Sequence, residues 1–278
     1  MDRPVITSRQ NPLIKFVCGL AEKKIRNKEG LFRFDGIKLL AEALDSRIEL
    51  KYIVYRHLAS ESVSALVENA LSSGRIAPDG AVAVSDEVFD KISEERSPEG
   101  VVTVARMADE IHLRADARGA EQICGDGDRV LIAESLRDPG NLGTVIRSCF
   151  ALGIDTLILT DDCADLYNGK TVRAAMGGIF RMRTVSLPAS QLPELITMLR
   201  NKGRRVYAAA LSDSAVSIGD IELKAGDCFV IGNEGHGLSE SVVLSCTRSV
   251  IIPMREDAES LNAAAAAAIC IWETVKVR

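Results

Sequence analysis

Apolar residues in the second half of the chain form short uninterrupted runs that alternate with amphipathic stretches. Runs of this length with no polar face predict strands that are buried on both sides. The runs are VLIAESL, TLILT, RVYAAAL, CFVIG and SVIIPM. The segments between them have helical spacing, and the chain ends in a predicted helix from Ser260 to Val277. Strands that alternate with helices predict an α/β domain over residues 128–278, with a parallel sheet covered on both faces.

In the first hundred residues, short predicted helices alternate with short predicted strands. Apolar residues at helical spacing in NPLIKFVCGLAEKK predict a helix, and LFRFDG predicts a strand that leads into the helix IKLLAEAL. Further strands and helices follow as far as VVTVA at 101–105. From residue 107 the sequence turns polar and ends in CGDGD. We therefore predict a small α/β domain over residues 1–106 and a linker over 107–127 that closes in a turn.

Three loops of the second domain combine glycine or proline with a few polar groups and contain no lysine. They are DPGNLGTVIRSCFALG, GNEGHGL and IPMREDAESLN. In open parallel sheets, ligands bind beyond the carboxyl ends of the strands, and glycine lets a ligand lie against bare backbone. None of the three loops contains the Gly-Lys-Ser/Thr of a phosphate-binding loop, and neither glycine cluster has the Rossmann spacing. These loops favour a nucleoside without phosphates over ATP or a dinucleotide.

Charge and composition narrow the class of protein. The formal net charge of −5 argues against a general nucleic-acid binder, but residues 1–58 hold twelve Lys or Arg and seven Asp or Glu. This part has the charge to offer a local basic face to phosphates, but on charge alone a solvated helix end is the favoured interpretation of KKIRNK. No apolar run reaches the roughly 20 residues of a membrane span, and the N-terminus lacks a secretory segment. Seven scattered cysteines and three histidines predict free thiols in the cytoplasm and no metal site.

The three loops resemble the signature motifs of the SpoU/TrmH branch of the SPOUT RNA methyltransferases. The matching stretches are DPGNLGTVIRSCFALG, FVIGNEGHGLS and IIPMREDAESLNAAAAAAICIWE, and VRAAMGGIFRM resembles a further family segment. Residues 8–44 resemble the small domain that binds the RNA substrate in such enzymes. The resemblance implies a parallel-sheet SPOUT domain with a trefoil knot, preceded by a small α/β, L30e-like RNA-binding domain. It also implies a homodimer, for which Trp272 and Ile271 would extend an apolar surface.

The resemblance also implies the site. It places S-adenosylmethionine against six positions: Leu211, Gly232, Asn233, Ile252, Met254 and Leu261. The family's catalytic arginine falls on Arg147, and the other polar motif positions are Asn141, Glu234, Ser260 and Asn262. Because a guanidinium stays protonated, we expect Arg147 to hold a phosphate or to stabilise a developing alkoxide rather than to act as a base. Glu234 is a candidate proton acceptor, with a structural role as the alternative.

Two other residues of the motifs are assigned structural roles rather than catalytic ones. We interpret His236 as a loop residue, and we expect Asp138 to cap the helix that begins near Asn141. Two features depart from the family pattern: REDAE at 255–259 stands where a small, glycine-bearing stretch is common, and Ala263 stands where valine is frequent. Neither of these two departures removes a polar motif group, so we expect an active enzyme.

The resemblance implies methyl transfer from S-adenosylmethionine to a ribose 2′-hydroxyl of structured RNA. The N-terminal domain favours 23S ribosomal RNA over transfer RNA. Three alternatives stay open: a transfer-RNA 2′-O-methyltransferase, an antibiotic-resistance ribosomal-RNA methyltransferase, and a catalytically silent RNA-binding assembly factor.

Overall fold

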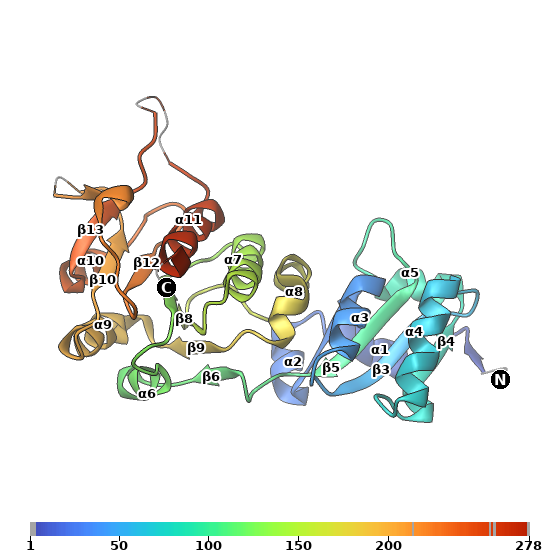
Figure 1. Ribbon diagram of the computed structural model, residues 1–278. Coiled ribbons are helices and arrows are strands. Elements are labelled where there is room, and N and C mark those ends of the chain that lie inside the picture. The colour runs from blue at the N-terminus through green and yellow to red at the C-terminus, as the bar shows by residue number, and fades with distance from the viewer. Residues whose placement is uncertain (1–3, 213, 256, 258–259, 277–278) are drawn as a thin grey trace. The chain divides into compact units, whose positions relative to one another are not determined.

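The computed structural model describes residues 4–212, 214–255, 257 and 260–276 (Figure 1). The chain divides into two compact units, each with its own sheet. The first unit comprises residues 1–108 and 167–180, and the second comprises residues 109–166 and 181–278. The segment 167–180 therefore belongs with the N-terminal unit, although it lies in the middle of the C-terminal sequence. The predicted domain boundaries stay a prediction.

The first unit is built on a mixed five-stranded sheet in the order β1-β4-β3-β5-β2. Strands β1, β4 and β3 are parallel, whereas β5 pairs antiparallel with both β3 and β2. The strands are β1 (Val5–Ile6), β2 (Leu31–Asp35), β3 (Leu50–Arg56), β4 (Ala81–Val84) and β5 (Val101–Arg106). Helices α1 and α5 pack on one face through Val17, Phe89 and Ile92. The helices are α1 (Pro12–Gly19), α2 (Lys23–Glu29), α3 (Ile37–Leu44), α4 (Glu61–Ser72) and α5 (Asp86–Ile92), with a 3₁₀ turn η1 (Pro78–Gly80).

The segment 167–180 forms α8 (Gly169–Ala175) and a 3₁₀ helix, η2 (Met176–Phe180). Its aromatic side chains contact those of β2: the ring of Tyr167 lies 4.6 Å from that of Phe32, and Phe180 lies 5.3 Å from Phe34. The hydroxyl of Tyr167 also accepts a hydrogen bond of 2.7 Å from the backbone N–H of Ala108. Buried aromatic contacts of this kind fix the segment to the N-terminal sheet.

The second unit is built on an eight-stranded sheet in the order β11-β13-β10-β12-β7-β8-β9-β6, and every pairing is parallel. The strands are β6 (His112–Arg114), β7 (Val130–Ala133), β8 (Thr156–Thr160), β9 (Thr184–Leu187), β10 (Val206–Ala209), β11 (Val216–Ser217), β12 (Cys228–Ile231) and β13 (Arg248–Ile251). The central strands are buried throughout, as their continuous apolar sequences predict.

Helices cover both faces of this sheet (Figure 1). On one face α6, α9 and α10 pack over Val130, Ile132, Val206 and Val230, which alternate along their strands with residues of the opposite face. On the opposite face, α7 and α11 pack against each other, and α11 contacts β12. The helices are α6 (Ala117–Ile123), α7 (Pro139–Leu152), α9 (Leu192–Asn201), α10 (Glu240–Ser245) and α11 (Ala263–Lys276), with 3₁₀ turns η3 (Ala189–Gln191) and η4 (Ile218–Asp220). After β13, which lies near one edge of the sheet, the chain continues to α11, which packs against α7.

The range predicted as a linker contains two elements of the second unit. Strand β6 adds to the edge of the sheet by pairing with β9, and α6 packs against α9. Ala117, Ala120 and Cys124 are buried there. The amphipathic signal was too short to separate from loop sequence, because a three-residue strand and a seven-residue helix contain only a few apolar positions.

Candidate functional site

The three motif loops lie at the carboxyl ends of the strands of the second sheet. Strands β10, β12 and β7 are neighbours and run in the same direction, so their carboxyl ends lie together. The segment 134–138 that leads into the first loop follows β7, the segment 232–239 follows β12, and the third loop begins at Ile252 after β13, the other neighbour of β10. This is the position at which parallel α/β sheets bind their ligands.

A chain of hydrogen bonds joins all three motifs. The side-chain amide of Asn141 donates to Glu234 Oε1 over 2.9 Å, and the amide of Asn262 donates to Asn141 Oδ1 over 2.9 Å. The backbone N–H of Asp138 donates to the same Glu234 oxygen over 3.3 Å. Glu234 Oε2 accepts no hydrogen bond from the described residues. The structure thus brings together three of the five polar residues that the sequence predicts.

Two of the helices that start here, α7 and α11, are capped by motif residues. Asp138 accepts from the backbone N–H of Asn141 over 2.8 Å, as predicted, although α7 begins at Pro139 rather than near Asn141. Asn262 Oδ1 accepts from the backbone N–H groups of Ala264 and Ala265, which caps α11. The predicted final helix therefore begins at Ala263 rather than at Ser260, and Val277 lies outside the described residues.

The loop after β12 is shaped by its own side chain and by a close backbone approach. Asn233 Oδ1 accepts from the N–H groups of Gly235 and His236, and its amide donates to the carbonyl of Ser135 over 2.7 Å. A Cβ at Gly232 would lie 2.3 Å from the carbonyl carbon of Gly237, which no side chain tolerates. Gly237 has φ +68°, in the left-handed region that favours glycine. Glycine is therefore required at 232 by the fold of the loop itself.

Sequence reasoning missed the residue that anchors the end of this loop. Glu134 follows β7 and is buried, with 7% of its surface exposed. Its carboxylate accepts from the backbone N–H of Ser239 over 2.8 Å and from the Ser239 hydroxyl over 2.6 Å. An acidic residue directly after an entirely apolar strand is the sequence signal for such an anchor, since a buried carboxylate needs donors close by.

Arg147 lies apart from the hydrogen-bonded residues. It is exposed on α7 and makes no hydrogen bond or ion pair with the described residues. At 100° per residue, six residues place it about 120° around the helix from Asn141. It shares the exposed side of α7 with Phe150, which is 44% exposed. Within one copy of the protein, Arg147 therefore makes no hydrogen bond with the network of Asn141, Glu234 and Asn262.

The predicted cofactor contacts follow the ends of β10, β12 and β13. Three of them are large apolar side chains with unusual exposure: Leu211 at 77%, Met254 at 37% and Leu261 at 39%. Ile252 and the backbone of Gly232 and Asn233 are half-buried. Apolar groups of this size that are left exposed at a strand-end site are typical of a surface that a ligand covers.

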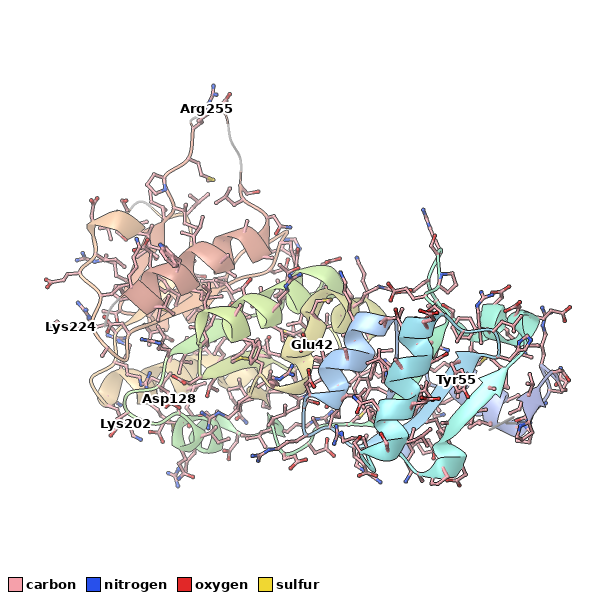
Figure 2. The ribbon with its side chains drawn as sticks, turned by 45° about the vertical axis from the view of Figure 1, so that its right-hand side comes forward. Glu42, Tyr55, Asp128, Lys202, Lys224 and Arg255 are labelled. Atoms are coloured by element: carbon pink, nitrogen blue, oxygen red, sulfur yellow. The ribbon has the colours of Figure 1, made fainter. Side chains whose placement is uncertain are left out.

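Two further motif side chains, those of Ser260 and His236, have no partner among the described residues. Ser260 is exposed and makes no hydrogen bond within the described part of the chain, and the ring of His236 makes none either. Arg255 stands at the outer end of the segment between β13 and α11 (Figure 2), where it pairs with Asp257 over 3.2 Å. Glu256, Ala258 and Glu259 of the REDAE stretch lie outside the described residues.

The cysteines do not offer a nucleophile at this site. Cys163 lies next to the segment that follows β7, where its Sγ accepts from the backbone N–H of Leu136 over 3.3 Å. Burial raises the pKa of Cys163, and it raises the pKa of Cys228 and of Cys270 to about 12. All seven cysteines are free. Within the described residues, no group of three or more His, Cys, Asp or Glu is arranged to hold a metal ion.

Comparison with known proteins identifies the chain. The crystal structure of an AdoMet-bound rRNA methyltransferase from Sinorhizobium meliloti is similar, with a TM-score of 0.80 and 27% identity over 98% of this chain and 97% of that chain. Fold and site together define the class of SPOUT-type RNA methyltransferases. The SpoU rRNA Methylase family matches residues 128–272, and the MRM3-like substrate binding domain matches residues 11–103. The chain belongs to the SpoU rRNA methylase family.

Two curated relatives align over almost their whole length. One is a 23S rRNA (guanosine(2553)-2′-O)-methyltransferase of Bacillus subtilis, 31% identical over 96% of this chain and 97% of that protein. The other is a 23S rRNA (uridine(2479)-2′-O)-methyltransferase of Streptomyces viridochromogenes, 27% identical over 98% of this chain and 92% of that protein. Their names give different target nucleotides, so the family assignment leaves the nucleotide open.

Proposed function

We propose that this chain transfers a methyl group from S-adenosylmethionine to a ribose 2′-hydroxyl of 23S ribosomal RNA. One observation carries the proposal: the methylase and substrate-binding families match residues 128–272 and 11–103, and a 23S rRNA methyltransferase aligns over 97% of its length. A ribosomal substrate fits a cytoplasmic protein with free cysteines. In the described residues, no helix has both the length and the apolar character to cross a bilayer.

The residues at the strand-end site fit this cofactor. Leu211, Met254 and Leu261 offer apolar surface to an adenine ring, and the bare backbone at Gly232 leaves room that a Cβ would fill. Ile252 and Asn233 complete the predicted contacts, with backbone groups available to a base edge or a ribose. When bound, S-adenosylmethionine supplies a methyl group that its positive sulfonium already activates, so the protein has to position the hydroxyl and take its proton.

We infer that Arg147 stabilises the charge that develops on the ribose oxygen or holds the neighbouring phosphate. Its guanidinium has no partner among the described residues, so all of its donors are available to RNA. The exposed Ser260 adds a hydroxyl to the same region of the motifs, and Asn262 fixes the start of α11 behind it. Arg147 stays protonated, so the proton of the hydroxyl must pass to another group.

We infer that Glu234 is a positioning residue, because its Oε1 holds Asn141 and the backbone of Asp138. Glu234→Gln keeps an acceptor oxygen and removes the charge. We expect this variant to retain turnover within about a factor of ten, since proton transfer by a general base contributes roughly 100-fold or more. A steady-state assay with saturating cofactor decides: a loss beyond 100-fold would make Glu234 the proton acceptor instead.

We propose that two copies of the chain form a homodimer through α7 and α11. The two helices pack together and each exposes an aromatic side chain, Phe150 at 44% and Trp272 at 52%. A dimer through this side would bring Arg147, which lies apart from its own motif loops, toward the loops of the partner. Exposed aromatics of this kind are enriched at interfaces.

Trp272→Glu is expected to shift the mass in solution from twice that of the chain to that of one chain, because it places a charge in the apolar centre of the interface. Light scattering coupled to size-exclusion chromatography measures this directly. Leu58→Glu is the matched control, since Leu58 is 77% exposed on the N-terminal unit and outside the proposed interface. A wild-type mass of one chain would contradict the dimer.

Methyl transfer tests the proposed function. Labelled S-adenosylmethionine is incubated with the protein and with total RNA from cells that lack the gene, and the label is followed by RNA size class. Label in large ribosomal RNA, recovered as 2′-O-methylnucleoside, is the expected result. Label in transfer RNA would keep the chemistry and overturn the substrate, and cofactor binding without label in any RNA would favour a silent assembly factor.

A further inference from the structure

The N-terminal unit contains a polar cavity that the motifs do not account for. It measures about 160 Å³ and lies between the turn that follows α1, strand β2, Glu94 and the segment from Tyr167 to Arg173. A cavity of about 150 Å³ holds one benzene ring, so this cavity has room for a single six-membered ring. It is far smaller than the roughly 300–1,000 Å³ of pockets for drug-sized ligands.

Two buried arginines hold the walls of this cavity in place. Arg26 donates from Nη1 to the carbonyls of Leu20 and Ala21 over 2.9 and 2.6 Å, which fixes the turn at the rim. Arg33 donates to the carbonyl of Ile92 over 2.7 Å and forms an ion pair with Glu94. Only 4% of Arg26 and 7% of Arg33 are exposed. The two guanidiniums are used to build the wall, so the cavity is preorganised.

The lining offers acceptors and donors to a ligand. Asp35 Oδ2 accepts from the hydroxyl of Ser93 and the N–H of Glu94, whereas its Oδ1 accepts no hydrogen bond from the described residues. Burial raises the pKa of Asp35, which the two hydrogen bonds partly offset. A carboxylate in such a setting gains from a donor on a ligand. Arg173 lies 3.8 Å from Glu95, and its side chain, 44% exposed, has donors to spare.

This lining selects among ligand classes. Three arginines also line the cavity, but Arg26 and Arg33 donate to backbone carbonyls and Arg33 is paired with Glu94. The carboxylates of Asp35 and Glu94 therefore disfavour a phosphate, and the polar walls disfavour an apolar group. A base with an amino group beside ring acceptors matches: cytosine offers N4–H₂ to a carboxylate and its N3 and O2 to Arg173. Uracil has the same size but carries an oxygen where cytosine carries the amino group, so it would turn an acceptor toward the carboxylates.

We propose that this cavity receives one unpaired base of the RNA substrate and selects cytosine over uracil. The inference rests on the proposed function, because it takes RNA as the substrate. The lining residues from Leu20 to Glu94 all lie within residues 11–103, which match a substrate binding domain. Sequence-specific RNA recognition uses unpaired bases that are hydrogen-bonded in pockets of this kind. The segment 167–173 adds its contacts from a part of the chain outside that match.

Titration of the full chain with cytidine 5′-monophosphate, uridine 5′-monophosphate and inorganic phosphate, followed by NMR shift changes, tests the site. Wild type is expected to bind the cytidine nucleotide about fivefold or more tightly than the uridine nucleotide, and phosphate not at all. Asp35→Asn, which replaces the accepting carboxylate, should bring the ratio close to one. Ala21→Phe should block the cavity without disturbing the fold, because Ala21 is exposed at the rim. Ala65→Phe, at an exposed position of α4 outside the lining, is the matched control.

Equal binding of the two nucleotides, or unchanged binding by Ala21→Phe, would overturn the proposal. Phosphate binding as tight as that of the cytidine nucleotide would also overturn it and would indicate an anion site instead. The methylation assay with wild type distinguishes a failure of the cavity proposal from a failure of the proposed function. If wild type methylates RNA and does not distinguish cytidine from uridine, the cavity proposal alone fails. If wild type selects cytidine and methylates no RNA, the proposed function fails.

Discussion

Replacing Arg147 by alanine is expected to lower kcat for methyl transfer by about 100-fold or more, which is the usual cost of removing one preorganised group that stabilises developing charge. The affinity for S-adenosylmethionine and the stability of the fold should not change. The reason is that Arg147 is exposed and makes no hydrogen bond or ion pair with the described residues, so its loss breaks nothing in the free protein. Single-turnover kinetics with saturating cofactor and RNA measure the chemical step.

Two further variants make this test specific. Arg147→Lys keeps the positive charge and loses the planar set of donors, so partial recovery separates charge from geometry. Arg118→Ala removes an equivalent charge from an exposed position on α6 and is expected to behave as wild type. If Arg147→Ala kept half of the wild-type rate, the arginine would have no part in catalysis.

Replacing Gly232 by alanine is expected to weaken cofactor binding by roughly 5- to 150-fold. A Cβ at this position would lie 2.3 Å from the carbonyl carbon and 2.5 Å from the carbonyl oxygen of Gly237, and 2.6 Å from the backbone nitrogen of Leu238. Backbone cannot move aside as a flexible side chain can, so the loop after β12 must shift. Overpacking of this kind costs about 1–3 kcal/mol, and 1.4 kcal/mol corresponds to a tenfold change in affinity.

Gly235→Ala in the same loop is the matched control, because the nearest atom to its Cβ is Asn233 Oδ1 at 3.5 Å, an ordinary contact. Isothermal titration with S-adenosylmethionine measures both variants, and urea unfolding shows whether either is destabilised. Equal affinities for the two variants would show that the conformation of this loop does not control the cofactor site.

The strands and loops of the second domain could be predicted because their signal is local. Continuous apolar runs such as the one at 228–231 predict buried strands, and motif residues such as Asp138 predict helix caps. The fold class and the family are confirmed by the family matches and the similar structures. The predicted site residues remain a proposal.

The pairings between motifs could not be predicted, because they join residues far apart in the chain. Asn141 and Asn262 are 121 positions apart, and Glu134 and Ser239 are 105 apart. Periodicity carries no information on which loops meet. The place of the segment 167–180 in the N-terminal unit is of the same kind, since it depends on Tyr167 and Phe180 finding the aromatic rings of β2.

Mapping of ribose methylation in cells tests the proposed function most directly. A 2′-O-methyl group removes the nucleophile of alkaline hydrolysis, so a methylated nucleotide is seen as a protected bond in the sequenced fragments. Ribosomal RNA is compared from cells without the gene, and from the same cells supplied with the wild-type gene or with Arg147→Ala. One protected nucleotide in 23S rRNA that returns with wild type and not with the variant is the predicted result. An unchanged pattern in ribosomal and transfer RNA in all three would contradict the proposed methyltransferase function.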